Sequence, residues 1–437
     1  MKLTHILLLE VTHAPGNLAK VLAVVGEAGV AVQALQSLGR KQNRTRWELT
    51  IELEKDLVDA LSNEINQLDI ATVIGASDRI MRQHEGGKIE VKSRSSIDNL
   101  QILRDIYTPG VAHVCLEIQK DPSLANKYTS IGNTVAIVTN GTAVLGLGDI
   151  GPLAGMPVME GKAALFQIFA GVSGIPILLE SKDPHEIIKV VEAIAPSFGA
   201  IQLEDIAAPA CFEVENELRL RLNQPVLHDD QHGTAVVVIA ALINAARITG
   251  VNLEECVIGQ IGLGAAGLGI AQLLMRFGVH LILGADLSTE AQARLKDIGG
   301  KPADLEYVMQ NADVIISTTG VKGLIKPEMI REGQIIFALS NPDPEIEPAL
   351  ALEQGARFAA DGRNINNVLA FPGLFRGVLD AGATKFTDAM LLAAAKAIAE
   401  AAPGDELIPS PLDHTAHKNV AIAVEAAARG SLNPISN

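Results

Sequence analysis

Two adjacent carboxylates, Glu204 and Asp205, follow a mostly apolar stretch with the sequence AIQL (200 to 203). Such a stretch predicts a buried strand, and the chain turns at the carboxyl end of a strand. Both acids can then face one crevice, where they repel each other unless a cation or a shared proton lies between them. Asp229 and Asp230, which precede a long apolar run, offer a third carboxylate. Oxygen ligands of this kind indicate a Mg²⁺ or Mn²⁺ site.

The same segments allow two other interpretations. His228 and His232 have the spacing i, i+4, and together with Cys211 they could bind zinc. Asp229 and Asp230 are also suitable caps for the N-terminus of a helix, with no ligand involved. At this level the sequence leaves all three interpretations open.

A glycine-rich motif follows the apolar stretch 257 to 261 and precedes a predicted helix. Its residues are Gly262, Gly264, Ala265, Ala266 and Gly267. The spacing GxGxxG between a strand and a helix is typical of a dinucleotide site, with the pyrophosphate at the helix N-terminus. Asp286 ends the next predicted strand, where an acid binds the ribose 2′-hydroxyl and rejects a 2′-phosphate. We therefore expect NAD as cofactor, while the nearby Arg294 leaves NADP open.

Composition favours a soluble protein that acts on small molecules. The chain has 437 residues, 48% of them hydrophobic and 20% charged, which predicts two or three domains with sizeable cores. A net charge of -16 without a basic tract argues against nucleic acid or anionic membrane as a main partner. The three cysteines are scattered, and the apolar run after Met1 is too short for a signal peptide, so we expect a cytoplasmic protein. The apolar window 234 to 246 is shorter than a bilayer span and predicts a buried helix.

The first 84 residues predict a small α/β module. Strands at 2 to 11 and 44 to 54, a helix within 15 to 30, and a second helix and strand give a β-α-β-β-α-β order, the ferredoxin-like plan. With the sequence HAPGNLAKVL at its first turn, this module resembles an ACT domain, a regulatory module that often binds amino acids. The resemblance implies an amino-acid effector at residues 15 to 17. A structural or dimerising module without a ligand is the alternative.

The remainder of the chain predicts two further domains. A polar segment, 83 to 96, is a natural linker, and from 234 to 375 apolar strands alternate with helical stretches, as in a doubly wound parallel sheet. A last helical region is expected at 388 to 430. The predicted fold is α/β throughout, and its three domains are a ferredoxin-like ACT-like regulatory domain (1–84), an α/β substrate domain (85–225) and a Rossmann NAD-binding domain with C-terminal helices (226–437).

Several motifs occur in the order and spacing of the small bacterial malic enzymes, and this resemblance covers about residues 95 to 430. The motifs are DIYTPGVA (105 to 112), LGLGDIGPLAGMPVMEGKAALF (145 to 166), QLEDIAAPACFEVE (202 to 215), HDDQHGTA (228 to 235), GLGAAG (262 to 267), LSNPDPE (339 to 345) and NINNVLAFPGLFRG (364 to 377). The resemblance implies oxidative decarboxylation of malate to pyruvate and CO₂, with reduction of NAD(P)⁺ and a divalent metal. The implied roles are metal ligand for Glu204, Asp205 and Asp230, general base for Lys162, general acid for Tyr107, partner of the lysine for Asp229, and amide contacts to substrate and nicotinamide ribose for Asn341 and Asn367. The lysine is expected to be kept neutral by its surroundings.

The chain departs from the pattern of the family at three places. Ala143 and Val144 precede the LGLGD motif, where larger malic enzymes have an arginine that holds a substrate carboxylate. Asp149 stands where Asn is expected in the bacterial group. Charged residues precede Tyr107, so this loop is expected to meet a partner subunit, in a homo-oligomer that is a dimer or larger.

Two rival functions remain at this level. A malolactic-type enzyme shares these motifs, keeps NAD bound and releases lactate. A metabolite-sensing protein with an inactive enzyme body is the other alternative, and the intact set of implied site residues speaks against it.

Overall fold

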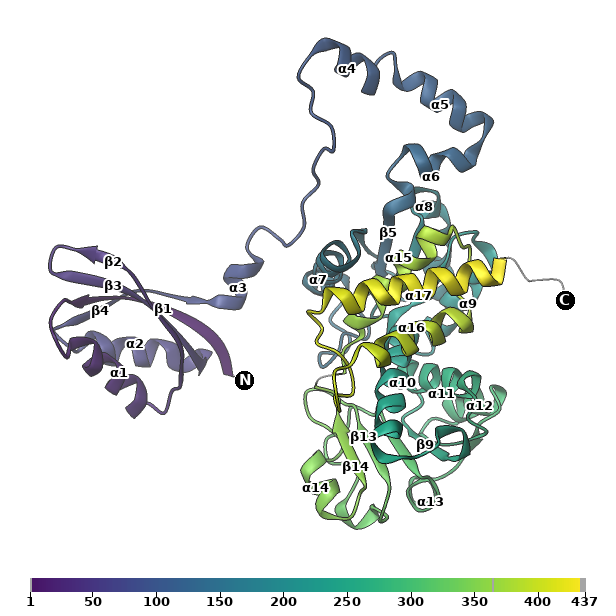
Figure 1. The fold of residues 1–437 in the computed structure, drawn as a ribbon. Helices are drawn as coiled ribbons and strands as arrows, with labels where there is room; N and C mark the ends of the chain where they lie inside the picture. Colours follow the sequence, from purple (N-terminus) through teal and green to yellow (C-terminus); the bar gives the residue numbers. More distant parts are fainter. Residues whose placement is uncertain (1, 364, 433–437) are drawn as a thin grey trace. The chain divides into compact units, whose positions relative to one another are not determined.

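The protein forms two compact units that divide between Glu90 and Val91. The computed structural model, drawn in Figure 1, describes residues 2 to 363 and 365 to 432. Residues 87 to 98, within and just after the predicted linker, belong to no helix or strand. The division falls shortly after the predicted domain boundary at residue 84.

The first unit has the expected ferredoxin-like order. Its antiparallel sheet has the strand order β2-β3-β1-β4, and β1 pairs with β3 and β4. Alternate side chains of the central strands, such as Leu7 and Leu9, are buried against Val21 and Val25 of the first helix, which gives this unit a core of its own. The elements are β1 (Lys2–Thr12), α1 (Asn17–Glu27), β2 (Val32–Lys41), β3 (Arg44–Glu54), α2 (Val58–Asn66), β4 (Ala71–Asp78) and α3 (Arg79–His84).

The second unit begins with helices and a four-stranded parallel sheet of order β6-β5-β7-β8. Every residue of β5 and β7 is buried, as is typical of a parallel sheet covered on both faces. The elements are α4 (Leu100–Ile106), α5 (Val111–Lys120), α6 (Ala125–Tyr128), β5 (Thr134–Thr139), α7 (Pro152–Ala170), β6 (Ser173–Leu178), α8 (Pro184–Ile194), β7 (Ala200–Leu203), α9 (Ala210–Arg221) and β8 (Val226–His228).

A second parallel sheet of six strands confirms the expected Rossmann-like arrangement. Its order, β11-β10-β9-β12-β13-β14, grows outward from β9 in both directions, so a switch point lies between β9 and β12. Ligands of such sheets bind outside the carboxyl ends of the strands at this point. The elements are β9 (Val257–Ile261), α11 (Ala265–Phe277), β10 (Leu281–Ala285), α12 (Thr289–Asp297), β11 (Lys301–Pro302), α13 (Leu305–Asn311), β12 (Val314–Ser317), β13 (Ile335–Ala338), α14 (Pro348–Glu353) and β14 (Phe358–Asp361).

The long helix α10 (Asp229–Thr249) connects the two sheets and packs against α11 and α16 (Figure 1). Most of its residues are buried in the largest hydrophobic cluster of the described chain. By length and composition this helix could cross a membrane, but 67% of its apolar window is buried inside the protein, in agreement with the buried helix that the sequence predicted.

The C-terminal region is two helices instead of one continuous helical stretch. Helix α16 (Asp388–Ala401) and helix α17 (His414–Leu432) are separated by a segment that contains Pro403, Gly404, Pro409 and Pro411. Proline cannot continue a helix because it lacks the backbone N–H and clashes with the preceding turn. Helix α17 packs on α16 and on α15 (Phe371–Ala381).

Candidate active site

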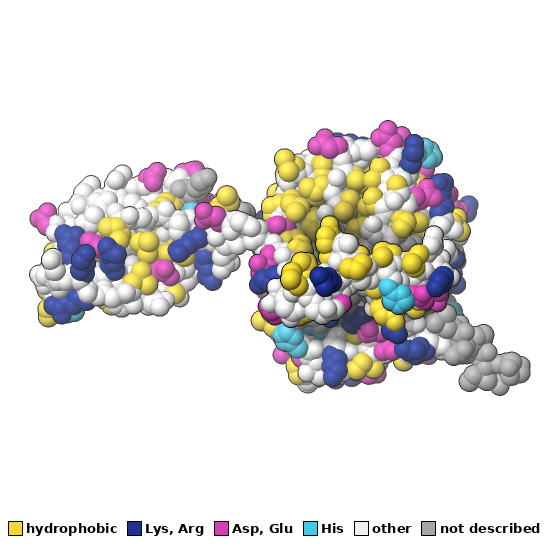
Figure 2. Space-filling model, turned by 90° about the horizontal axis from the view of Figure 1, so that it is seen from above, with side chains coloured by type: hydrophobic (Ala, Val, Ile, Leu, Met, Phe, Trp, Pro, Cys, Tyr) yellow, Lys and Arg dark blue, Asp and Glu magenta, His cyan; other side chains and the backbone are white. Residues whose placement is uncertain are grey.

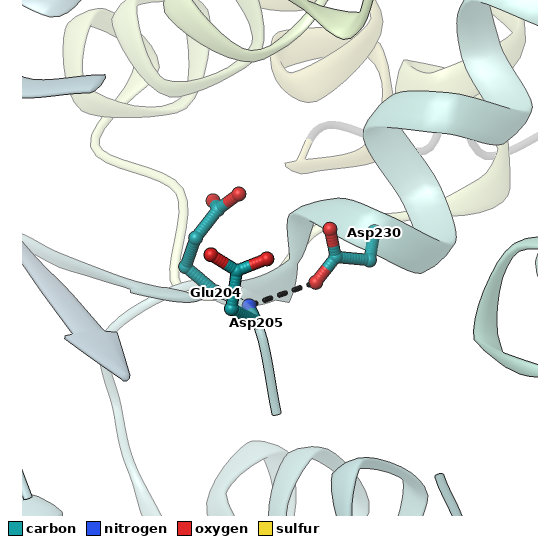
Figure 3. A group of neighbouring side chains, drawn as sticks. All are labelled: Glu204, Asp205 and Asp230. Atoms are coloured by element: carbon teal, nitrogen blue, oxygen red, sulfur yellow. Dashed lines mark hydrogen bonds between the residues drawn. The ribbon is translucent and has the colours of Figure 1, made fainter. Parts of the chain in front are cut away.

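The pairing of two short strands brings the predicted metal ligands together. Strands β7 and β8 are parallel, with Leu203 opposite His228, so the residues that follow each strand leave the same edge of the sheet side by side. Glu204 and Asp205 follow β7, and Asp230 lies in the first turn of α10 (Figure 3). One carboxylate oxygen from each of these three residues lies within 4.8 Å of the other two. Three oxygens this close form a set that a divalent cation can bridge.

Backbone geometry fixes Asp205 in this cluster. Its φ angle is 52°, in the left-handed region that Asp tolerates better than most residues. Its N–H donates to Oδ2 of Asp230 at 2.9 Å, and its carbonyl oxygen accepts hydrogen bonds from the N–H groups of Thr142 and Ala143. Its own Oδ2 is buried without a hydrogen-bond partner among the described residues. A cation would satisfy this oxygen, so the residues fit the metal that the sequence implies.

The cluster carries more negative charge than its surroundings favour. Burial, with repulsion from Asp230, raises the pKa of Asp205 to about 7. Burial also raises the pKa of Glu204, which is 2% exposed. Deprotonated carboxylates in a buried cluster are stabilised by a cation, which supports the same conclusion from the electrostatics.

Lys162 reaches the cluster from helix α7. Its Nζ lies 2.5 Å from Oδ2 of Asp229 and 3.1 Å from Oε1 of Glu204, and it lies 4.5 Å from the ring centre of Phe371. Burial alone lowers the pKa of Lys162, but the carboxylates of Asp229 and Glu204 outweigh burial and raise it. Without a cation, the acids that surround Lys162 therefore stabilise its ammonium form. The expectation of a neutral lysine refers to the site with its metal and stays a prediction.

Asp229 connects the lysine with Asn367. The Oδ2 atom that pairs with Lys162 also accepts a hydrogen bond of 2.8 Å from Nδ2 of Asn367, in the short turn that precedes α15. One turn further along α10, a Cβ atom added at Gly233 would lie 1.9 Å from Oδ1 of Asp229, so only glycine leaves room for this carboxylate. The structure thus brings Lys162, Asp229 and Asn367 together, while the roles that the resemblance implies for them stay predictions.

Tyr107 is not part of this group within the single chain. It follows helix α4 and is 69% exposed, and neither α4 nor α5 has a buried residue. The residue predicted as general acid therefore lies on an exposed surface of the chain.

Each of the three glycines in the GxGxxG motif suits its position for a different structural reason. Gly262 has a φ angle of 86°, and a Cβ there would lie 2.8 Å from the carbonyl oxygen of Thr318. A Cβ at Gly267 would lie 1.9 Å from the carbonyl oxygen of Gly262. A Cβ at Gly264 would have no atom within 4 Å, so this glycine leaves open space at the start of α11. A tight turn, close helix packing and an open approach are the features that a pyrophosphate site requires.

Asp286 lies at the carboxyl end of β10, next to this glycine loop. Its Oδ2 accepts a hydrogen bond of 2.7 Å from the N–H of Leu263, and its Oδ1 accepts one of 2.8 Å from the N–H of Ser288. Its carboxylate therefore borders the loop, where a ribose hydroxyl would approach. The guanidinium of Arg294 lies 5.1 Å above the ring of Phe212 on helix α9.

Asn341 follows β13, and its Nδ2 donates to the carbonyl oxygen of Gly362 at 3.1 Å. A Cβ added at Gly146, in the LGLGD motif, would lie 3.9 Å from Cδ of Pro342. The loop that carries Asn341 in the six-stranded sheet therefore lies next to the loop that follows β5 in the four-stranded parallel sheet. Residues that follow strands of these two parallel sheets border the space between the two loops.

The zinc interpretation is not supported by the described residues. Nε2 of His232 lies 3.0 Å from Glu215, Cys211 is buried in a hydrophobic cluster, and Nε2 of His228 lies 3.6 Å from Oδ2 of Asp230. Within residues 2 to 363 and 365 to 432, the only group of three or more His, Cys, Asp or Glu residues with metal-binding spacing is the acidic one.

Two buried polar residues of the site were missed in the sequence. Gln202, within β7, donates from Nε2 to Oε2 of Glu204 at 2.5 Å. Glu215, on α9, accepts hydrogen bonds from the N–H of His228 and from the side chains of Gln231 and His232, and thereby holds the first turn of α10. A glutamine within an apolar strand is a visible sign of a buried polar contact. Glu215 is one of several acids on a charged helix, so the sequence does not distinguish it from its neighbours.

Asp149, the unexpected acid of the LGLGD motif, has a partner. Its Oδ2 lies 2.5 Å from Nζ of Lys182, and both side chains are about half exposed or more. The structure therefore accounts for the substitution as an exposed ion pair.

Comparison with known proteins decides the family. Residues 86–185 match the N-terminal domain of malic enzymes, and residues 231–295 and 353–428 match their NAD-binding domain. The chain belongs to the malic enzyme family. The expected activity of this family, oxidative decarboxylation of malate with NAD(P), and the expected class, an NAD(P)-dependent oxidoreductase, are thereby confirmed.

The relatives and structures of the family cover most of the chain. The chain is 50% identical to NAD-dependent malic enzyme 1 of Bacillus subtilis over 97% of both sequences. It is 42% identical to the NAD-dependent malic enzyme of Geobacillus stearothermophilus, over 94% of this chain and 91% of that one. The crystal structure of a malic enzyme from Pyrococcus horikoshii has a TM-score of 0.75 and 42% identity, over 79% of this chain and 87% of that one.

Proposed function

We propose that this malic enzyme decarboxylates malate to pyruvate with Lys162 as the general base and with a Mg²⁺ or Mn²⁺ ion held by Glu204, Asp205 and Asp230. The observation that carries the proposal is the convergence of the lysine with the three acids at the carboxyl edge of β7 and β8. The unpartnered Oδ2 of Asp205 supports the presence of a cation. When bound, the cation supplies positive charge that polarises the C2 oxygen of malate and offsets the carboxylates that raise the pKa of Lys162.

The residues around Lys162 define its task. Nζ of Lys162 takes the proton of the C2 hydroxyl of malate, and Asp229 holds Nζ in place through their contact of 2.5 Å. Asn367 fixes the carboxylate of Asp229 from the other side and places an amide at the substrate. When bound, the nicotinamide supplies the acceptor for the C2 hydride. The C4 carboxylate then leaves as CO₂, and the phenol of Tyr107 gives its proton to C3 of the resulting enolate.

We expect Lys162→Ala to lower kcat by a factor on the order of 10² to 10⁴, the range for the loss of a general acid or base. The assay measures NADH and pyruvate from malate in the presence of Mn²⁺. Lys189→Ala, on the exposed side of α8, is the matched control and keeps the parent rate. Equal rates for Lys162→Ala and the parent would overturn the mechanism.

The malolactic alternative predicts a different product. One relative, 44% identical over 78% of this chain and 90% of its own length, is the bifunctional malic/malolactic enzyme of Bacillus subtilis. We propose release of pyruvate with NADH in equal amounts. Lactate without free NADH would instead favour the malolactic reaction.

We propose NAD as the preferred dinucleotide and Asn341 as a contact to the nicotinamide ribose. Asp286, beside the glycine loop, would bind the ribose hydroxyls and repel a 2′-phosphate. Comparing kcat/KM for NAD and NADP, in the parent and in Asp286→Ser, tests this assignment, and a parent that uses NADP better would contradict it.

We also propose that the enzyme works as a homo-oligomer, at least a dimer, in which a second copy covers the region around Tyr107. Figure 2 shows hydrophobic side chains gathered on one face of the larger unit. The exposed hydrophobic side chains of α4 and α5 include Leu100, Leu103, Ile106, Val111 and Leu116. Large exposed apolar areas are typical of interaction surfaces. Sedimentation of the purified protein tests the proposal, and a monomer that turns over malate would contradict it.

We propose that the N-terminal unit is an ACT-like regulatory domain that binds an amino-acid effector near the turn between β1 and α1. Gly16 has a φ angle of 81° there, and Nδ2 of the nearly buried Asn17 donates to the carbonyl oxygen of Thr12. A panel of amino acids tested for shifts in melting temperature and in malate turnover checks the proposal. No response to any of them would favour a structural module.

A further inference from the structure

Glu345 is a fully buried acid in the motif that supplied Asn341. It lies in the loop after β13 and has an exposed fraction of 0%. Charged side chains are buried in this way only when other groups replace the water that they lose. Neither the cation cluster nor the lysine of the catalytic site uses this carboxylate.

The carboxylate of Glu345 joins two loops of the Rossmann sheet. Its Oε1 accepts hydrogen bonds from the N–H of Thr319 at 2.7 Å, from the hydroxyl of Thr319 at 2.8 Å and from the hydroxyl of Ser340 at 2.5 Å. Its Oε2 accepts a hydrogen bond from the N–H of Ser340 at 3.2 Å. The Ser340 hydroxyl in turn accepts one from the N–H of Gly320 at 2.7 Å. Thr319 follows β12 and Ser340 follows β13, so one side chain ties together two neighbouring strand ends.

Glu345 makes these contacts as an anion. Burial by itself raises the pKa of its carboxyl, but the hydrogen bonds from Ser340 and Thr319 outweigh burial and lower the pKa below its usual value. Hydrogen bonds to an ionised acceptor are roughly twice as strong as neutral ones. The two loops are therefore held firmly in one arrangement.

Both loops border the place where a dinucleotide binds. Strand β12 lies directly beyond the switch point from β9, and the carbonyl oxygen of Thr318 would lie 2.8 Å from a Cβ added at Gly262 of the glycine loop. Asn341, to which we assign a nicotinamide contact, is the residue after Ser340. Glu345 thus fixes the backbone of the β12 and β13 loops, which lie on the β12 side of the switch point between β9 and β12.

We propose that Glu345 is a positioning residue for the nicotinamide half of the dinucleotide, which acts by holding the β12 and β13 loops in the geometry that NAD requires. The assignment of the site to NAD rests on the proposed function. The expected consequence is a loss of dinucleotide affinity that is independent of malate and of metal.

The test is Glu345→Gln, measured as the Kd for NADH by fluorescence titration without malate and with a chelator present. The amide keeps the shape but turns an NH₂ group toward hydrogen-bond donors, so at least one donor loses its acceptor. We expect binding to weaken about tenfold or more, the equivalent of one hydrogen bond to a charged group. The KM for NAD should rise, whereas Mn²⁺ affinity in calorimetry should stay at the parent value.

Two further variants make the result decisive. Glu347 lies two residues after Glu345 and is an exposed acid that contacts Arg363. The control variant Glu347→Gln should keep the parent Kd. Ser340→Ala removes the hydroxyl that donates to Glu345 and accepts from the N–H of Gly320, without changing the carboxylate. It should weaken NADH binding less than Glu345→Gln does. If Glu345→Gln does not fold, a loss in Ser340→Ala alone supports the proposal, and a parent Kd in Ser340→Ala overturns it.

The outcome separates a positioning role from a purely structural one. If Glu345→Gln has a lower melting temperature but the parent Kd when folded, Glu345 only stabilises the fold and the proposal is overturned. If Asn341→Ala keeps the parent Kd while Glu345→Gln loses affinity, the contact assigned to Asn341 fails but the role of Glu345 stands. If the parent binds no dinucleotide, the proposed cofactor itself is refuted.

Discussion

Removing one charge from the acidic cluster should make the metal-free enzyme more stable at neutral and alkaline pH. The variant is Asp205→Asn, which keeps the shape of the side chain. Asn also tolerates the left-handed backbone at this position, where φ is 52°. The hydrogen bond from the backbone N–H to Asp230 and those to the carbonyl oxygen do not depend on the charge. The substitution therefore tests electrostatics with little change in geometry.

The expected gain follows from the pKa of Asp205. Because the folded pKa is raised from 3.8 to about 7, the folded protein holds the proton more tightly than the unfolded chain does. The stability from this proton is fully present below pH 3.8 and is lost as the pH rises through about 7. The folded and unfolded pKa values differ by about 3 units, and each unit is worth about 1.4 kcal/mol. The loss relative to acid pH is therefore about 4 kcal/mol, and it is complete at pH 8. Because the repulsion is shared with Asp230, we expect Asp205→Asn to recover about 2 to 4 kcal/mol.

The assay is urea denaturation with a chelator at pH 6 and at pH 8. The parent should be less stable at pH 8 than at pH 6, and Asp205→Asn should reduce this difference. Added Mn²⁺ should stabilise the parent and have much less effect on the variant, because a bound ligand stabilises only the state that holds it. Asp405→Asn, whose side chain is 89% exposed, is the control and should change stability little. A metal-free Asp205→Asn that is no more stable than the parent at pH 8 would refute the reasoning.

Three further substitutions test other parts of the site. Gly267→Ala should abolish NADH binding in fluorescence titration, because its Cβ would lie 1.9 Å from the carbonyl oxygen of Gly262; retained binding would contradict the tight packing of the loop. Gly264→Ala should keep the parent melting temperature, since no atom lies within 4 Å of its Cβ, yet weaken NADH binding by closing the open approach. Glu215→Gln should weaken Mn²⁺ binding in calorimetry about tenfold, because the first turn of α10 loses an ionised acceptor, and an unchanged affinity would show that Asp230 is held without it.

The sequence was sufficient where function depends on residues at strand ends. Glu204, Asp205, Asp229 and Asp230 each follow a short apolar strand, and parallel pairing of those strands leaves little choice about where the acids meet. The GxGxxG turn is similarly local, since a side chain at Gly262 or Gly267 would meet backbone atoms and Gly264 leaves open space at the start of α11.

The sequence was insufficient where a contact depends on which faces of distant helices meet. Glu215 reaches the first turn of α10 from α9, and its neighbours Glu213 and Glu217 look the same in the sequence. The protonation of Lys162 depends on the three-dimensional balance between burial and nearby carboxylates, which no linear pattern reveals. Tyr107 is 69% exposed in the described chain, so its place relative to the other site residues rests on the proposed second copy.

Helix α10 joins the chemistry of the protein to its folding. Its first two residues are Asp229 and Asp230, while most of its residues from Ala235 to Ala246 are buried among apolar side chains of the largest core. The residues proposed for catalysis and the residues of the core therefore belong to one continuous element. A large-to-small exchange deep in this helix, such as Val237→Ala or Leu242→Ala, should leave a cavity in the core beneath the turn that carries both acids, so that stability and metal affinity are expected to fall together.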